Sequence, residues 1–214
     1  YNIDEMDLIA EEPTAAVASM TIGTSSSISS DDVDKIAYHL PAMGGLTAGI
    51  SHTDRTAAGG TDTTSYGAKY SMEAGGASIT LGYAVIADEN ATQDVDSENM
   101  GLKVVSGDIS MILSTGKYEG SDEDRDNTGV GFSFAMPNGM TLGAYTFKSE
   151  DDLDAGEEYS RNGVELQYTI ASGLTAVINV DDYDYKEGSD PDGSGSSHVN
   201  DSGTQTKLTI KAAF

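Results

Sequence analysis

Ionisable side chains are the residues of this sequence that could do chemistry, and acids dominate among them. The 214 residues include 36 Asp and Glu, 11 Lys and Arg, and 3 His, which gives a formal net charge of −25. Cysteine is absent, so the chain has no disulfide, thiolate metal ligand or cysteine nucleophile. So negative a chain argues against nucleic acid as a partner, because phosphate binding requires clusters of Lys and Arg. The charge favours cations and cationic solutes instead.

One acidic segment has the ligand spacing of a calcium-binding loop. Oxygen-bearing side chains fall at positions 1, 3, 5 and 12 of that pattern, and Gly195 falls at position 6. The alternative is that the acidic loops bind Ca²⁺ or Mg²⁺ loosely, because chance matches are expected in a sequence this rich in Asp and no helices flank the segment. No other cofactor is indicated. The four possible metal ligands are Asp190, Asp192, Ser194 and Asp201.

Signatures of catalysis are weak. The three histidines, His39, His52 and His198, are far apart in the sequence. A Ser-His-Asp triad is recognised by geometry, but the nucleophile-elbow pattern has only a low-complexity counterpart around residues 193–195, without the strand-to-helix context it needs. No phosphate-binding loop or dinucleotide fingerprint is present. We therefore expect that the protein is not an enzyme.

Alternating segments of about ten residues must position these polar side chains. In residues 174–180, for example, Leu, Ala, Ile and Val occupy alternate positions, and Thr, Val and Asn lie between them. The apolar faces of such segments carry no charge, whereas the opposite faces carry small polar residues and Lys. Strict alternation predicts β-strands. We expect eleven strands, at residues 34–40, 46–52, 64–72, 77–86, 99–106, 109–118, 128–135, 140–149, 161–170, 174–185 and 204–214.

The expected strands recur as hairpins. The first large apolar residue after each short turn recurs every 30 to 34 residues, and each unit holds two alternating segments, one short turn and one long polar connection. Short turns on one side and long loops on the other, joining strands of about 9–11 residues, are typical of a transmembrane β-barrel. Tyrosines near the strand ends would form aromatic girdles. These tyrosines are Tyr38, Tyr66, Tyr83, Tyr118, Tyr168 and Tyr183.

A soluble β-sandwich would show the same alternation, with the apolar face packed as a core. The alternative hypothesis is therefore an acidic surface-layer or extracellular β protein whose Asp-rich loops bind calcium. The regular alternation of short turns and long acidic connections along the chain favours the membrane interpretation.

Residues 36–51 have the sequence IAYHLPAMGGLTAGIS. They resemble the strand–turn–strand of Gram-negative general diffusion porins, the trimeric porins of the outer membrane. Residues 208–214, LTIKAAF, resemble that family's closing strand, whose terminal aromatic residue, here Phe214, is an assembly signal. The resemblance covers roughly residues 34–214. It implies a multi-pass barrel in the cell outer membrane, a homotrimer in contact with lipid and lipopolysaccharide, and passive diffusion of small hydrophilic solutes and ions.

The strand number predicts that this chain is part of a larger barrel. Bacterial single-chain barrels have even numbers of strands, and the resemblance implies sixteen, with a third loop that folds into the lumen. We therefore expect five further strands before this chain, residues 1–33 as the constriction loop, and residues 34–214 as the barrel strands. The alternative is that residues 1–33 hold an external acidic helix that ends at Pro13.

In an inward-folding loop, acids would face basic residues across the narrowest part of the pore. Such a constriction, together with the net charge of −25, predicts a preference for cations. The expected acidic residues are Asp4, Glu5, Asp7, Glu11 and Glu12, and the expected basic wall residues are Lys35, Lys207 and Lys211.

Overall fold

The structure, a computed structural model, describes residues 34–54, 62–89, 94–120, 124–153, 156–186 and 200–212. No helix in these ranges is long and apolar enough to cross a membrane. They form β-strands that join in one antiparallel sheet. The strands are β1 (Asp34–His39), β2 (Leu46–Asp54), β3 (Asp62–Ala74), β4 (Ala77–Glu89), β5 (Asp94–Ser106), β6 (Ile109–Glu119), β7 (Asp124–Ala135), β8 (Met140–Asp151), β9 (Glu158–Ala171), β10 (Leu174–Lys186) and β11 (Asp201–Ala212).

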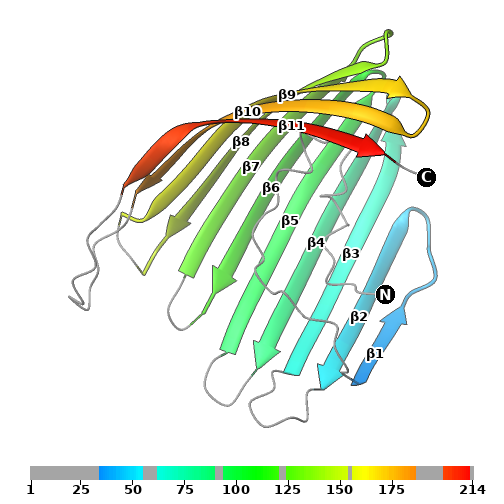
Figure 1. Cartoon of the computed structure of the whole chain (residues 1–214). Coiled ribbons are helices and arrows are strands. Elements are labelled where there is room, and N and C mark those ends of the chain that lie inside the picture. Colours follow the sequence, from blue (N-terminus) through cyan, green and yellow to red (C-terminus); the bar gives the residue numbers. More distant parts are fainter. Residues whose placement is uncertain are drawn as a thin grey trace.

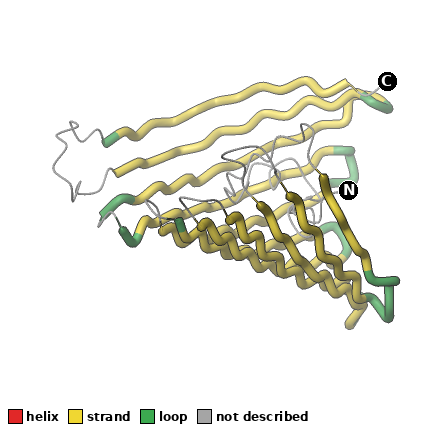
Figure 2. Tube along the Cα trace, turned by 90° about the horizontal axis from the view of Figure 1, so that it is seen from below, coloured by secondary structure: helices red, strands yellow, loops and turns green. Residues whose placement is uncertain are grey.

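The strands follow one another around the sheet in the order of the sequence, each paired with its neighbours. The sheet curls strongly, so that β9 to β11 arch over toward the side on which β1 to β3 lie (Figure 1). Figure 2 shows the same curl from below, as a trough of tilted strands. Closing a sheet into a barrel requires strands that twist and tilt in this way. The described part of the chain therefore forms a curved wall with a concave and a convex face.

The two faces differ in most of their side chains, although Ile86, Ile112 and Val177 are apolar and buried on the concave face. Exposed apolar residues cover the convex face, among them Ile50, Leu81, Phe132, Leu142 and Ile178. Small polar residues alternate with them on the concave face and are buried, among them Ser51, Ser65, Ser97, Asn99, Ser110 and Ser133. A continuous exposed apolar face is what contact with lipid requires. A soluble sandwich would bury that face as its core, so the described sheet contradicts the soluble alternative.

The short turns hold the hairpins in register. Gly45, in the turn between β1 and β2, has a φ of 89°, a conformation that residues with a Cβ rarely adopt. A Cβ at this position would also collide with the carbonyl oxygen of Ser71 on β3. The Ser71 amide donates a hydrogen bond of 2.9 Å to the carbonyl oxygen of Gly45. Glycine is therefore required both for the turn and for its contact with the next strand.

All eleven predicted strands are present, but many extend further toward the long connections than predicted. β5 begins at Asp94 rather than at residue 99, β7 begins at Asp124 rather than at 128, and β4 continues to Glu89. In β5 and β7 these extensions carry acids at the alternate positions that hold apolar residues further along the strand, so they lack the apolar alternation that predicts a strand. Backbone pairing continues regardless, for instance between Asp96 and Ala87. The long connections are correspondingly shorter than the sequence suggested.

The girdle prediction is wrong for two of the six tyrosines. Tyr38, Tyr66, Tyr83 and Tyr168 are exposed among the apolar side chains. Tyr118, in contrast, is in register with buried Ser97, and Tyr183 is in register with Arg161. Nearness to a strand end does not fix the face; parity along the strand does. Tyr118 and Tyr183 therefore belong to the concave wall.

Candidate functional site on the concave wall

Residues directly opposite one another on neighbouring strands point to the same face of a sheet. The concave wall of β7 to β11 can therefore be described in rows. One row consists of Gly131, Tyr145, Gly163, Asp181 and Gln205. The row next to it, on the side of the short turns, consists of Ser133, Gly143, Glu165, Asn179 and Lys207. Acidic, basic, amide and phenolic side chains thus share one wall.

Tyr145 and Asp181 meet across Gly163. The Tyr145 hydroxyl donates a hydrogen bond to Oδ1 of Asp181, although the two residues lie on strands that do not pair with each other. A Cβ on Gly163, on the strand between them, would collide with the Tyr145 ring and with Asp181 Oδ1. Asn179 adds a hydrogen bond of 3.5 Å from Nδ2 to the Tyr145 hydroxyl. The absent side chain of Gly163 therefore makes this contact possible.

Arg161 supplies the countercharge to Asp181. Its guanidinium forms an ion pair with Oδ2 of Asp181, and its Cζ lies 6.0 Å from the centre of the Tyr145 ring, within cation–π range. The Asp181 side chain is 1% exposed, whereas that of Arg161 is 28% exposed. A buried carboxylate needs such a partner, because an uncompensated buried charge is costly. Asp181 and Tyr145 therefore hold the Arg161 guanidinium in place on the wall.

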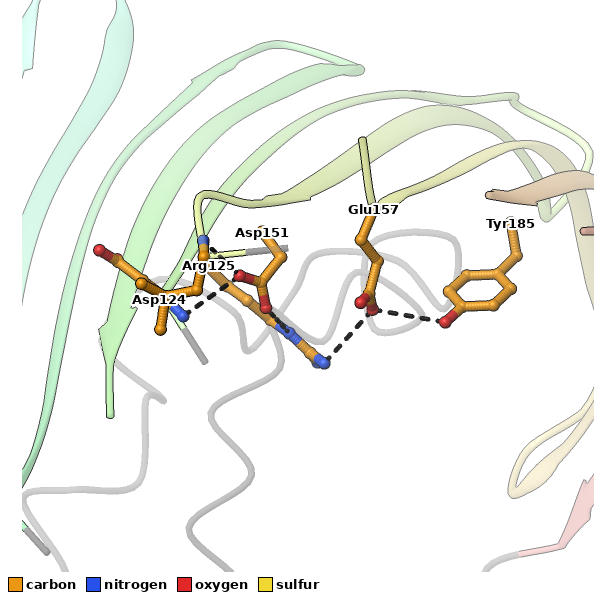
Figure 3. Close-up of polar contacts among 6 residues, drawn as sticks. Asp124, Arg125, Asp151, Glu157 and Tyr185 are labelled. Carbon is orange, nitrogen blue, oxygen red and sulfur yellow. Dashed lines mark hydrogen bonds and ion pairs between the residues drawn. The ribbon is translucent and has the colours of Figure 1, made fainter. Parts of the chain in front are cut away.

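A second charged cluster lies at the end of the wall near the long connections. Oδ2 of Asp151 lies 3.5 Å from Nε of Arg125, and Oε1 of Glu157 lies 3.7 Å from an Nη atom of Arg125. The Tyr185 hydroxyl donates a hydrogen bond of 3.4 Å to Oε1 of Glu157. Figure 3 shows these side chains converging from β7, β8, β10 and the connection before β9, beneath the arch of the sheet. The cluster thus joins three strands and one loop on the concave side.

The predicted wall lysines occupy both edges of the sheet. Lys207 and Lys211 lie on β11, are exposed, and are in register with concave-face positions of β10. Lys35 lies on β1, opposite Thr53 of β2. The described strands therefore do not bring Lys35 together with Lys207 and Lys211. A role for these lysines as a basic pore wall stays a prediction.

The other predicted site residues lie mostly outside the described residues. They include the whole expected constriction loop, residues 1–33, with its five acids, as well as Asp190, Asp192, Ser194 and Phe214. Asp201 is described as the first residue of β11 and accepts a hydrogen bond of 3.2 Å from the Tyr183 hydroxyl. Within the described ranges no group of three or more acids or histidines could hold a metal ion. The calcium loop and the assembly signal stay predictions.

The sequence did not single out Tyr145, Arg161 or Asp181. Asp181 falls in a segment predicted as strand, and its parity with Asn179 on the polar face was a usable signal. Tyr145 likewise has the parity opposite to Leu142 and Ala144 on its strand, and Arg161 the parity opposite to Val164 and Leu166 on its own. The contact among the three depends on the register of three strands, which cannot be read from any one of them. The sequence could therefore show which residues share the concave face, but it could not show that these three side chains contact one another.

The sequence and the fold both match porins. A family model described as Gram-negative porin matches residues 3–213, while no curated protein matches the chain. An anion-selective porin from Comamonas acidovorans is 17% identical, with a TM-score of 0.63, over 85% of this chain and 59% of that chain. OccK1 (OpdK) from Pseudomonas aeruginosa is 13% identical, with a TM-score of 0.64, over 83% of this chain and 55% of that chain. OccAB4 from Acinetobacter baumannii is 14% identical, with a TM-score of 0.64, over 84% of this chain and 52% of that chain.

At these identities the likeness to solved structures shows the fold, and the chain spans only 52% to 59% of the length of these three porins. The predicted fold class, an all-β antiparallel transmembrane barrel with about eleven strands in this chain, is confirmed. The predicted outer-membrane location is confirmed as well. Because the family model covers nearly the whole sequence, the chain belongs to the Gram-negative porin family.

Proposed function

We propose that the chain forms part of the wall of a passive outer-membrane channel, through which small hydrophilic solutes and ions diffuse. The contrast between the two faces of the sheet supports this most directly. Apolar residues such as Phe132 are exposed on the convex face, while neighbours such as Ser133 line the concave face. A concave wall of hydroxyl, amide and charged groups suits a water-filled lumen. Porins are channel proteins, and the proposal includes no catalytic step.

We propose a barrel of sixteen strands in which five further strands join β1 to β11. Both of these strands lie at edges of the described sheet, and a barrel wall leaves no strand edge unpaired in lipid. The constriction would come from residues 1–33 folding into the lumen, with the acids at positions 4, 5, 7, 11 and 12 in its narrowest part. A homotrimer in contact with lipid and lipopolysaccharide completes the proposal, with loosely bound Ca²⁺ or Mg²⁺ at the acidic loops.

We propose that the channel prefers cations. The net charge of −25 and the acids of the concave wall support this preference. Some of these acids are compensated, since Arg161 pairs with Asp181 and Arg125 lies between two carboxylates. Clustered acids at the loop ends would still concentrate cations at the pore mouth. The anion selectivity of the Comamonas porin belongs to that protein, whose likeness to this chain is one of fold.

Conductance of the full-length protein in a planar bilayer tests the proposal. Discrete, voltage-independent steps in potassium chloride are expected for an open diffusion channel. Reversal potentials in a salt gradient should report cation preference at low salt, and the preference should fade toward molar salt as the Debye length shortens. A protein that gives no steps would contradict the channel. Steps with anion preference at low salt would contradict only the proposed selectivity.

A further inference from the structure

A pocket of about 350 Å³ opens on the concave wall near the long connections. Its size lies at the lower end of the range for small-molecule sites, roughly 300–1,000 Å³. The side chains that matter for its chemistry come from β7, β8, β9, β10 and the loop before β9. They are Arg125, Phe147, Asp151, Glu157, Tyr159 and Tyr185.

Three aromatic rings give the pocket an apolar surface. The ring centres of Phe147 and Tyr159 lie 6.1 Å apart, and their planes are tilted by 57°. Tyr185 is directly opposite Tyr159 on the neighbouring strand. Aromatic rings offer large, rigid contact surfaces, and tyrosine adds a hydroxyl that forms hydrogen bonds. Three such rings in a wall of small polar residues indicate a surface for a solute with an apolar face.

The charged groups of the pocket are paired with one another. Arg125 lies 3.5 Å from Asp151 and 3.7 Å from Glu157. The Asp151 side chain is only 2% exposed, and its Oδ1 also accepts a hydrogen bond of 2.9 Å from the Leu153 amide. One guanidinium between two carboxylates leaves a net negative site, which disfavours an anionic solute. The guanidinium and the two carboxylates are held in fixed positions, and they can still form hydrogen bonds with a neutral polar solute.

Neutral hydrogen-bonding groups complete the lining. Asn127 and Ser149 contribute an amide and a hydroxyl, in register with each other and with Tyr159. An amide offers both donors and acceptors, and a hydroxyl offers both as well. The pocket therefore combines an aromatic surface, neutral donors and acceptors, and an ion cluster that carries a net negative charge.

We propose that this pocket is a binding site for a neutral sugar ring on its way through the channel. The C–H face of a pyranose would pack on the aromatic rings, and its hydroxyls would bond to Asn127, Ser149 and the carboxylates. The inference rests on the proposed channel, because it places the site on the solute path. It adds a solute class and a position on that path.

Calorimetric titration of the full-length protein in detergent tests the site. Glucose, maltose and maltotriose are the neutral probes, benzoate is the anionic probe and choline is the cationic probe. We expect saturable binding of the saccharides, tighter than that of choline, and no binding of benzoate. The variant Tyr159→Ala should weaken saccharide binding at least about tenfold, the loss of an aromatic contact of roughly 1.4 kcal/mol. Tyr168→Ala on the convex face of the same strand is the matched control and should bind like the wild type.

Three results would each overturn the proposal. They are no saccharide binding by the wild type, preferential binding of benzoate or choline, and equal effects of Tyr159→Ala and Tyr168→Ala. Bilayer conductance without sugar separates this failure from that of the channel. If the protein conducts but binds no saccharide, only the sugar site is wrong; if it does not conduct, the channel is wrong. Tyr159→Phe provides a second variant that keeps the ring and should retain most of the binding. Loss of binding in Tyr159→Phe equal to that in Tyr159→Ala would contradict the packing role of the ring.

Discussion

Tyr145 reaches across Gly163 to donate its hydroxyl hydrogen to Asp181, two strands away. A hydrogen bond between strands that are not paired with each other ties β8, β9 and β10 together on the concave side, in addition to their backbone ladders. The same carboxylate fixes Arg161. One missing side chain thus determines where a tyrosine, a carboxylate and a guanidinium lie.

Replacing Gly163 with alanine should reduce the free energy of unfolding by about 1–3 kcal/mol, the usual cost of overpacking. The new Cβ would collide with the Tyr145 ring and with Asp181. Urea titration of the full-length protein in lipid vesicles measures the change. The double variant Tyr145→Ala, Gly163→Ala is the control. It removes the ring, so the alanine at 163 should then cost much less, and equal costs in both backgrounds would show that the collision is not the cause.

Asp181→Asn should shift ion selectivity toward anions. The variant removes the countercharge of Arg161, whose side chain is 28% exposed on the concave wall, and so leaves a guanidinium facing the solute path. Reversal potentials in a potassium chloride gradient measure the shift. Asp182→Asn is the matched control, because Asp182 is exposed on the other face and accepts its hydrogen bond from Thr204. Equal shifts in both variants would place Asp181 away from the ion path.

Arginine on the convex face should be far more destabilising than arginine on the concave face. Ile178→Arg places a charge on the exposed apolar face and should cost about 2–4 kcal/mol if the site lies at the membrane midplane. Gln167→Arg, on the concave face of the neighbouring strand, should be much milder. Unfolding titrations in lipid vesicles compare the two variants. Similar losses would mean that the concave side is packed like a core and does not hold water.

Neutralising Glu11 and Glu12 to glutamine should reduce cation preference more than neutralising Asp94 and Asp96 to asparagine. A charge in a narrow neck acts on every passing ion, whereas a charge at the rim is largely screened at physiological salt. Reversal potentials of the two double variants measure the difference. If the variants at 94 and 96 have the larger effect, residues 1–33 do not form the constriction.

The sequence predicted the strands well because each strand carries its own signal. Alternation of apolar and polar residues, as in Phe132, Ser133 and Phe134, depends only on neighbours along the chain, and the faces of these residues in the structure follow it. The strand ends near the long connections were predicted too short, because β5 and β7 begin, at Asp94 and Asp124, with acids at the alternate positions that hold apolar residues further along. At these strand ends the backbone pairs with the neighbouring strand, but no apolar face in the sequence indicates that a strand is present.

The candidate sites could not be predicted in the same way. Tyr145 and Asp181 are 36 positions apart in the sequence, and their contact depends on how β8, β9 and β10 align. The role of Gly163 is equally invisible in the sequence, since glycines also occur at turns and at other wall positions. Parity identifies which residues share the concave face, but only the register identifies which of them touch.

Every strand of the sheet pairs only with strands adjacent to it in the sequence. A hairpin can therefore be inserted or deleted during evolution without breaking any other pairing, provided that the strands on either side can pair anew. Because barrel diameter grows roughly linearly with strand number, each such event would change the width of the pore by a fixed increment. Because the strands are paired in the order of the sequence, duplication of a hairpin-coding segment can change the width of the pore in steps.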